Sequence, residues 1–391
     1  MSERNEGVNE QGRRQLVRLN RRGFVGAALG TLAAPAALVA RAGSEPAALS
    51  RSIAGSPLTI ARQGSLFLAG AKVSVPGAFD PNAMPMGGLD GDSYWAHQVY
   101  VHYQVPERQR GLPIVMLHGA GQTGATWEST PDGREGFQSL FLRMGHPVYT
   151  VDLPHAGRAG SPEIGPGGGL AHPPSRGGER MNFVLSRLGP VPFEYFPNSQ
   201  FPRQGFDAFC RQDVPFINFK PEFLANALTE LTERTGPIIL FTHSNSGMVG
   251  WLAATNNAKV KGVVAFEPGG FLFPDEVPQL PPLSSGAPIP LGQAMPKPQF
   301  AQLARVPIQV VLGDNIPQRP VAAFGLDIYR VVAAAADEFV SAIRSQGGNA
   351  AVLSLPREGL SGNSHFAFSD LNNAAVAERV EHAIRRDFAA A

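Results

Sequence analysis

The stretch Thr242-His243-Ser244-Asn245-Ser246-Gly247 decides the fold prediction, because it joins a short apolar run to a predicted helix. The run PIILFT (237–242) is continuous and apolar, which is typical of a buried central strand, and 248–254 is predicted as the helix. A sharp strand-to-helix turn that exposes one serine is a nucleophile elbow, usually written G-x-S-x-G. Here Thr242 and Ser246 replace the two glycines, so a serine-rich helix N-cap is the alternative. We predict Ser244 as the nucleophile.

Strands and helices alternate on both sides of this turn. The predicted strands are 97–105, 112–117, 146–153, 237–242, 260–266, 306–312 and 350–355, and the predicted helices are 137–144, 221–234, 248–254, 326–345 and 375–388. Buried strands alternating with helices predict an α/β fold with a mostly parallel sheet covered on both faces. Two segments, 154–220 and 269–304, are rich in Pro, Gly and Phe and lack periodicity, so we expect long lid or cap loops there.

The run Leu117-His118-Gly119-Ala120-Gly121 follows the 112–117 strand and is the second chemical signal. Acyl transfer develops negative charge on a carbonyl oxygen, and two pre-aimed backbone N–H groups stabilise that charge. Small residues at this point let backbone amides face a cavity, although a plain β-turn would have the same composition. We predict the amides of Ala120 and Asn245 as the oxyanion-hole donors.

A serine nucleophile needs a base, and His365 lies in a polar loop between the last strand and the last helix. A carboxylate must then fix the imidazole tautomer. Glu267 follows the 260–266 strand, and Asp314 follows the 306–312 strand. The usual position in this architecture is after the later strand, which favours Asp314. Both keep the chain order Ser, acid, His, so spacing leaves the two open.

Composition excludes several classes of protein. The 391 residues include 33 Lys+Arg, 32 Asp+Glu and a single cysteine, Cys210. A formal charge of +1 gives no electrostatic case for nucleic-acid binding. One cysteine excludes an intramolecular disulfide framework and a Cys-rich metal site. The predicted serine, histidine and carboxylate mechanism itself implies neither a metal nor an organic cofactor.

The N-terminus has the layout of an export signal. Residues 1–22 are polar and basic, 23–40 are weakly apolar, and Ala40-Arg41-Ala42 is a small-x-small cleavage pattern. The run 20–25 (NRRGFV) resembles a twin-arginine signal, and an N-terminal membrane anchor is the alternative. Residues 1–42 hold seven Arg and three Glu, so 43–391 carries 26 basic and 29 acidic residues, a formal −3. We expect a periplasmic or secreted protein with one domain, 43–391.

Four segments together resemble the α/β-hydrolases, in particular the group of the bacterial esterase 713. They are LHGAGQTGATWESTPDGREGF (117–137), THSNSG (242–247), FEPGG (266–270) and GNSHFAFSDLNN (362–373). The resemblance implies an α/β-hydrolase fold and an acid after the strand that follows the elbow, which selects Glu267 over Asp314. It also implies that the missing elbow glycines are a family trait. Ala120-Gly121 departs from the cysteine pair of the type member, and the long loops differ, so substrate preference does not carry over.

The predicted activity is hydrolysis of a small-molecule carboxylic ester through an acyl-enzyme, with Ser244, His365 and Glu267 as the triad. One alternative keeps the triad and cleaves a lactone, amide or polyester. Another is a non-catalytic exported binding protein on a hydrolase scaffold. A homodimer is compatible with the sequence, whereas a nucleic-acid partner and stable membrane insertion are not expected.

Overall fold

The computed structural model describes residues 56–82, 89–160, 162–163 and 174–388. The predicted export signal (1–42) and its cleavage site lie outside the described residues. All of these described residues belong to one compact unit. Among the described residues, no helix has both the length and the apolar character needed to cross a membrane.

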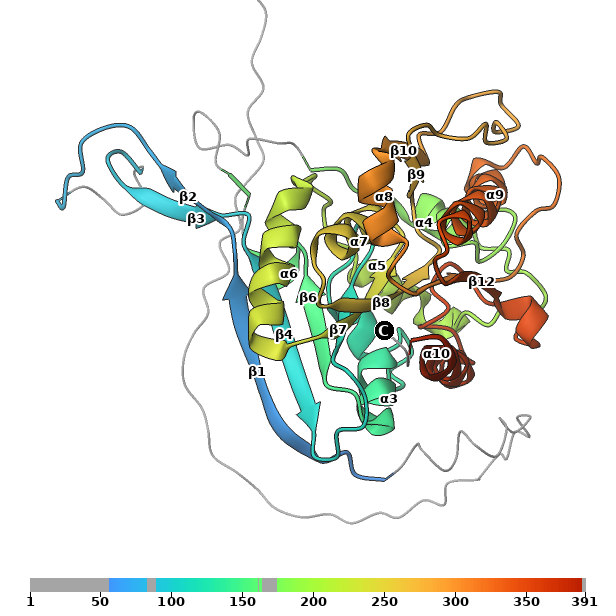
Figure 1. Cartoon of the computed structure of the whole chain (residues 1–391), viewed down its shortest axis with the longest axis horizontal. Coiled ribbons are helices and arrows are strands. Elements are labelled where there is room, and N and C mark those ends of the chain that lie inside the picture. The colour runs from blue at the N-terminus through green and yellow to red at the C-terminus, as the bar shows by residue number, and fades with distance from the viewer. Residues whose placement is uncertain (1–55, 83–88, 161, 164–173, 389–391) are drawn as a thin grey trace, which may run out of the picture. The chain divides into compact units, whose positions relative to one another are not determined.

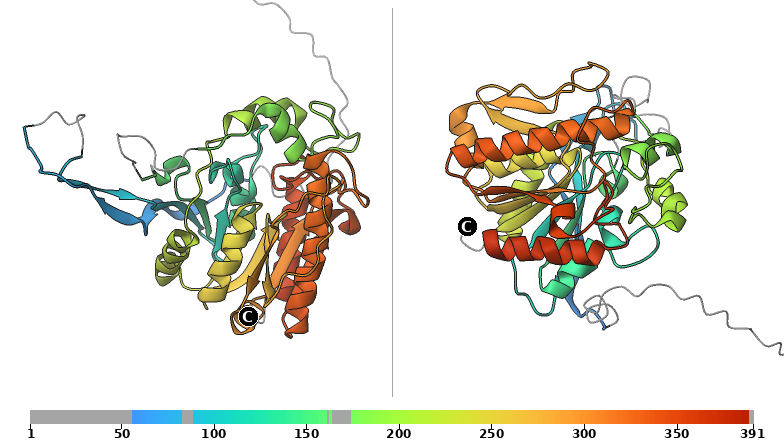
Figure 2. Two further views of the ribbon diagram at one scale, coloured as in Figure 1. Left: turned by 90° about the horizontal axis from the view of Figure 1, so that it is seen from above. Right: turned by 90° about the vertical axis from the view of Figure 1, so that its right-hand side faces the viewer.

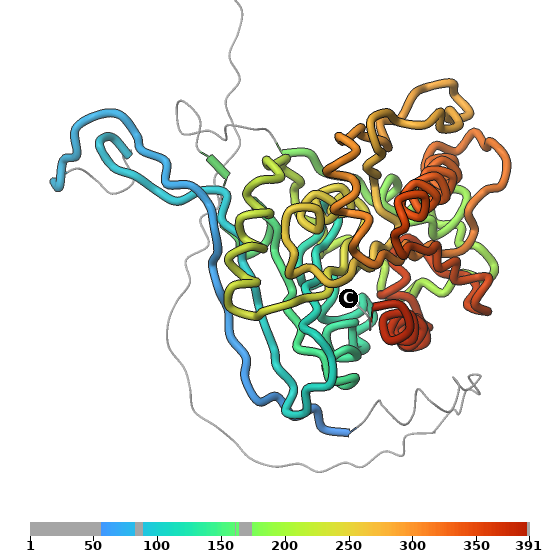
Figure 3. The backbone as a smooth tube through the Cα atoms, in the orientation of Figure 1, coloured from blue at the N-terminus to red at the C-terminus, as the bar shows by residue number. Residues whose placement is uncertain are grey.

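Within the described residues, eight strands form the central sheet in the order β1-β4-β6-β5-β7-β8-β11-β12. These strands are β1 (Ile60–Leu68), β4 (Val99–Pro106), β5 (Ile114–Leu117), β6 (Val148–Asp152), β7 (Ile238–His243), β8 (Val260–Phe266), β11 (Ile308–Leu312) and β12 (Ala350–Ser354). The β1–β4 and β4–β6 pairs are antiparallel and the other five are parallel. β1 (blue) and β12 (red) lie at opposite edges (Figure 1, Figure 3). The predicted mostly parallel sheet is confirmed.

Helices cover both faces of the sheet, because alternate residues of each central strand point to opposite sides. Val115 and Leu117 of β5 belong to one core, whereas Ile114 and Met116 belong to the other. The first core is completed by α6 (Pro221–Thr235), α7 (Ser246–Asn256), α8 (Lys297–Leu303) and α9 (Phe324–Ser345), and the second by α3 (Phe137–Met144) and α10 (Asn373–Asp387). Figure 2 shows α9 and α10 on opposite sides of the strands.

The two segments predicted as long loops contain short elements that the sequence pattern did not reveal. The described part of segment 154–220 holds α4 (Glu179–Leu185) and α5 (Phe206–Arg211), beside two 3₁₀ turns. Segment 269–304 holds α8 and the parallel pair β9 (Phe271–Pro274) and β10 (Gly292–Met295). None of these helices exceeds seven residues, so none shows enough turns for an apolar period to be recognised.

Three strands before β4 were also not predicted, because their sequences lack a clear strand pattern. β1 is an edge strand with mostly exposed or half-buried residues, so it lacks the apolar run of a central strand. β2 (Ala71–Ser74) and β3 (Ser93–Ala96) pair with each other as a separate ribbon that projects from the sheet (Figure 1).

The parallel register brings the predicted site segments to one edge of the sheet. Leu117 at the end of β5 lies beside Thr242 of β7, and His243 of β7 lies beside Phe266 of β8. Each of these strands is therefore followed by a predicted site segment at the same carboxyl edge, which is where open α/β sheets bind their ligands.

Candidate active site

Ser244 occupies a strained turn between β7 and α7. Its φ of +50° lies in the left-handed region that non-glycine residues avoid. Three backbone hydrogen bonds hold it there: Ser244 N donates to Phe266 O (3.0 Å), and Ser244 O accepts from Gly247 N (3.0 Å) and Gly269 N (2.7 Å). The N-cap of α7 is Asn245, which makes no side-chain cap hydrogen bond. Ser244 is therefore the turn residue and does not cap the helix.

The start of α7 packs closely on the strand ends around the turn, because Gly250 lies opposite Thr242 and Gly247 lies opposite Pro268. A Cβ on Gly250 would lie 2.4 Å from Thr242 Cγ2, and a Cβ on Gly247 would lie 2.4 Å from Pro268 Cβ. The Ser246 hydroxyl lies within hydrogen-bond distance of Leu117 O (3.2 Å) and accepts from His243 N (3.0 Å). Gly250 of α7 thus provides the space that the Thr242 side chain needs.

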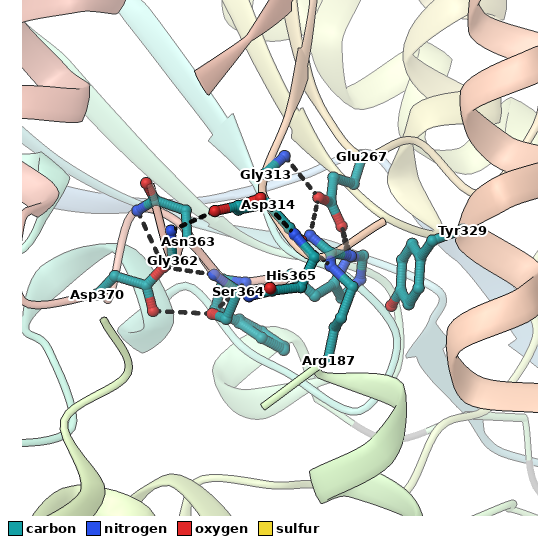
Figure 4. A network of polar contacts seen from close by, with 12 residues as sticks. Arg187, Glu267, Gly313, Asp314, Tyr329, Gly362, Asn363, Ser364, His365 and Asp370 are labelled. Carbon is teal, nitrogen blue, oxygen red and sulfur yellow. Dashed lines mark hydrogen bonds and ion pairs between the residues drawn. The ribbon is translucent and has the colours of Figure 1, made fainter. Parts of the chain in front are cut away.

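Glu267 and His365 form a buried pair (Figure 4). His365 Nδ1 donates to Glu267 Oε2 at 2.6 Å, and Glu267 Oε1 accepts from Gly313 N at 2.8 Å. Burial opposes ionisation of Glu267, but the Arg187 charge and the hydrogen bond from His365 outweigh it and lower the pKa of Glu267 to about 2. An ionised carboxylate can only accept, so Nδ1 carries a proton and Nε2 is the other ring nitrogen available for chemistry.

Ser244 lies next to this pair. His243 Nε2 donates to His365 O at 3.1 Å, and the two imidazole rings are 4.4 Å apart between centroids. Among the described residues, Ser244 Oγ makes no hydrogen bond, and such contacts often tighten only when substrate binds. The structure therefore gathers Ser244, Glu267 and His365 at one edge of the sheet and bonds the last two.

Asp314, the other candidate acid, bonds the backbone of the loop that carries His365 (362–372, the histidine loop). Its Oδ2 accepts from Gly362 N (2.7 Å) and from Asn198 Nδ2 (3.0 Å), and its Oδ1 accepts from Asn315 N (2.7 Å). These bonds hold the loop that leads to His365, and the imidazole itself is bonded to Glu267.

Arg187 is a site residue that the sequence analysis missed. It follows α4, and its side chain is fully buried. Its Nη1 donates to Glu267 Oε2 at 2.7 Å and its Nη2 donates to Oε1, so the guanidinium grips both carboxylate oxygens. Its Nε donates to Asp314 O (2.6 Å), and its guanidinium lies 4.3 Å from the Tyr329 ring centroid. No spacing rule links an arginine in an aperiodic segment to a glutamate 80 residues later.

The predicted oxyanion donors, Ala120 and Asn245, lie beside the turn that holds Ser244. Gly119 packs against the elbow, since a Cβ there would lie 3.1 Å from Ser244 Cβ. His118 Nδ1 donates to Gly119 O (2.7 Å), and because the carbonyl and N–H of one peptide point in opposite directions, this bond aims the Ala120 N–H away from His118. Ala120 and Asn245 are both exposed, and within the described ranges neither amide donates to another protein group.

Two buried histidines, His118 and His243, lie beside the turn. Burial lowers the pKa of His118, whose Nε2 accepts from Leu153 N at 3.1 Å. Burial, reinforced by His365, also lowers the pKa of His243 well below its usual value. Burial therefore disfavours the charged form of both rings.

Asp370 is a second residue that the sequence analysis missed. It holds the histidine loop through hydrogen bonds to Asn363 and Ser364. Its carboxylate accepts from Ser364 N (2.7 Å), Ser364 Oγ (2.8 Å) and Asn363 Nδ2 (3.1 Å) (Figure 4). Burial raises the pKa of Asp370 to about 7, against the opposing effect of these hydrogen bonds and of Arg187.

Aromatic side chains of segment 174–220 separate into two groups. Phe201 and Phe209 are buried, and Phe209 packs 4.9 Å from Phe366, the neighbour of His365. Phe216 and Phe219 line a cavity of about 10 Å³ beside His118, Gly119 and Gly121. That volume holds roughly one water molecule, so this wall of the site is tightly packed. Among the described residues, no group of three His, Cys, Asp or Glu side chains is arranged to hold a metal ion.

Comparison with known proteins completes the description of the site. No protein-family model matches the chain. "Probable secreted lipase phiG" from Fungal sp. (strain ATCC 74256) is 34% identical over 199 residues, covering 48% of this chain and 54% of that protein, so the chain spans about half the length of this relative. A solved structure described as that of a novel bacterial esterase is 28% identical with a TM-score of 0.69, covering 85% of this chain and 98% of its own. With the sheet, the elbow and these similarities taken together, the chain belongs to the α/β-hydrolase superfamily.

Proposed function

We propose that this protein is a serine hydrolase that cleaves carboxylic esters through an acyl-enzyme. The observation that carries the proposal is the 2.6 Å bond between His365 Nδ1 and Glu267 Oε2 beside the strained Ser244 turn. That bond sets the imidazole tautomer that a serine nucleophile requires. The bacterial esterase and the fungal lipase among the similar proteins support an ester as the substrate.

The reaction proceeds in two halves. Ser244 Oγ attacks the ester carbonyl carbon while His365 Nε2 takes the hydroxyl proton, and Glu267 stabilises the resulting imidazolium. The amides of Ala120 and Asn245 stabilise the oxyanion, each contributing about 3 kcal/mol. Collapse breaks the bond to the alcohol oxygen, which receives the proton from His365. Water, deprotonated by His365, then releases the acid and restores Ser244.

Replacement of the nucleophile tests this proposal. We expect Ser244→Ala to lower kcat for an activated aryl ester by about 10⁴-fold or more, with an unchanged thermal unfolding midpoint. A fluorophosphonate probe should label the unmodified protein, since its P–F bond breaks as a bond from Ser244 Oγ to phosphorus forms. Ser341→Ala, on an exposed position of α9, is the matched control and should keep full activity. Labelling that persists in Ser244→Ala would refute the assignment.

We also propose that the protein is exported through residues 1–42. The twin-arginine pattern in 20–25 and the word "secreted" in the name of the fungal relative support export. Cell fractionation of the full chain tests it. Replacing Arg21 and Arg22 together by lysine should leave the protein inside the cell, and unchanged export of that variant would exclude the twin-arginine route.

A further inference from the structure

Three consecutive residues at the end of α4 contact three parts of the active site. Tyr329 Oη donates to Leu185 O, His365 N donates to Ser186 O at 3.0 Å, and the Arg187 side chain grips Glu267. Segment 185–187 therefore touches both the base and its acid. It does so from outside the sheet, because α4 belongs to the 154–220 segment and not to a sheet-covering helix.

The Arg187 contact leaves the Glu267 carboxylate a single usable orientation. The two guanidinium nitrogens bond the two carboxylate oxygens, and Gly313 N adds a third donor on Oε1. A planar fork matched to a carboxylate fixes its plane as well as its position, which a lysine ammonium cannot do. Oε2 is thereby held where His365 Nδ1 meets it at 2.6 Å.

The site also has no room for Arg187 to move. A Cβ on Gly313 would lie 2.6 Å from Arg187 Nη2, so glycine at this position makes space for the guanidinium. The Arg187 Nε bond to Asp314 O and the Tyr329 ring close its other sides. A fully buried ion pair costs desolvation and contributes only when its geometry is this complete.

We propose that Arg187 is a positioning residue for the proposed reaction, on which this inference rests. It holds the Glu267 carboxylate in the plane that His365 needs, and it makes the triad depend on the seating of segment 174–220.

Two substitutions separate the shape of Arg187 from its charge. Arg187→Lys keeps the charge and loses the fork, so kcat should fall by about 10- to 100-fold with little change in KM and with the acidic limb of the pH profile in place. Arg187→Met also removes a positive charge from beside the buried Glu267–His365 pair, so proton uptake by the pair should become easier and the acidic limb should move up by about one pH unit or more. Arg176→Lys, an exposed arginine of the same segment, is the control and should match the unmodified protein.

A second readout does not depend on activity. A carboxyl whose folded pKa is depressed stabilises the folded chain above its ordinary value of 4.5 and loses this contribution as the pH falls toward about 2. The difference in the free energy of unfolding between the unmodified protein and Arg187→Met should therefore shrink between pH 7 and pH 3. This measurement stands even if Ser244 proves inert toward esters.

The kinetic and stability measurements each test whether Arg187 positions the Glu267 carboxylate. Wild-type kcat in Arg187→Lys would overturn the proposal, and that arm remains decisive if Arg187→Met does not fold. A stability difference that stays constant with pH would show that Arg187 acts only by packing. Loss of kcat in Arg187→Lys, with KM and the acidic limb unchanged, would support the positioning role.

Discussion

Two of the proposed catalytic residues hold backbone conformations that side chains disfavour. Ser244 has a φ of +50° and Glu267 has a φ of +41°. Such positions cost on the order of 1–3 kcal/mol each and persist only where the surroundings enforce them. Here the neighbouring strand holds each residue: Ser244 N donates to Phe266 O of β8, and Glu267 N donates to Val311 O of β11. The strain at the nucleophile and at the acid is thus held by adjacent strand ends.

The two carboxylates near the histidine loop should respond differently to loss of charge. We expect Glu267→Gln to lower kcat by about 10³- to 10⁴-fold, because an amide can no longer stabilise the imidazolium or fix its tautomer. Asp314→Asn should cost less than about 10-fold, because its carboxylate bonds the backbone of the loop and not the ring. Steady-state kinetics on one ester compare the pair. A larger loss in Asp314→Asn would show that the acid is misassigned.

At the scale of elements, the strand-turn-helix unit β7–α7 keeps its geometry without the two elbow glycines. Thr242 is fully buried on β7, and α7 approaches it closely at Gly250. The threonine methyl occupies the space that an alanine at 250 would need. Glycine is therefore needed at position 250 of α7, and it is not needed at position 242 of the turn.

Gly250→Ala should destabilise the folded protein by about 1–3 kcal/mol, although alanine is the better helix former. A Cβ at 250 would lie 2.4 Å from Thr242 Cγ2, and a β-branched side chain in a strand cannot turn away. Thr242→Ser removes that methyl, so the double variant Thr242→Ser/Gly250→Ala should recover most of the loss. Denaturant unfolding of all four proteins measures the coupling. Additive effects would exclude the contact as the cause.

At the scale of the whole molecule, the buried carboxyls Glu267 and Asp370 make the stability of the folded chain depend on pH in opposite directions. Glu267 is held ionised by Arg187, whereas Asp370 is buried with hydrogen-bond donors that do not fully compensate it. Asp370 also joins distant parts of the chain, since Arg134 donates to its backbone oxygen at 3.1 Å. The loop that carries His365 thus depends on a group that titrates within the working range of most enzymes.

The stability of Asp370→Asn, relative to that of the unmodified protein, should increase as the pH rises. The folded pKa of Asp370, about 7, lies above its ordinary value of 3.8. Its contribution therefore favours the folded chain at low pH and is lost as the pH rises through 7. We expect the difference in Tm between Asp370→Asn and the unmodified protein to shift by about 2–5 °C toward the variant between pH 5 and pH 8. Asp337→Asn, on an exposed position of α9, is the control. A difference that does not change with pH would contradict the shifted pKa.

The sequence by itself determined the sheet class and most of its elements. The bounds of α3 and β8 match their predictions, and the central strands were recognisable because burial on both faces leaves continuous apolar runs. The same local pattern located Ser244 at a strand-to-helix turn and His365 in a polar loop, where the structure places them. These features depend on neighbours along the chain, so a local pattern records them.

Only the tertiary structure decided which groups meet. Glu267 and Asp314 follow adjacent strands, and their spacings are equally acceptable, yet only Glu267 reaches the His365 ring in the described residues. Arg187 and Asp370 were invisible in the sequence for the same reason. A buried charge is defined by a partner distant along the chain and by the loss of water around it, and neither property has a periodicity that a sequence can display.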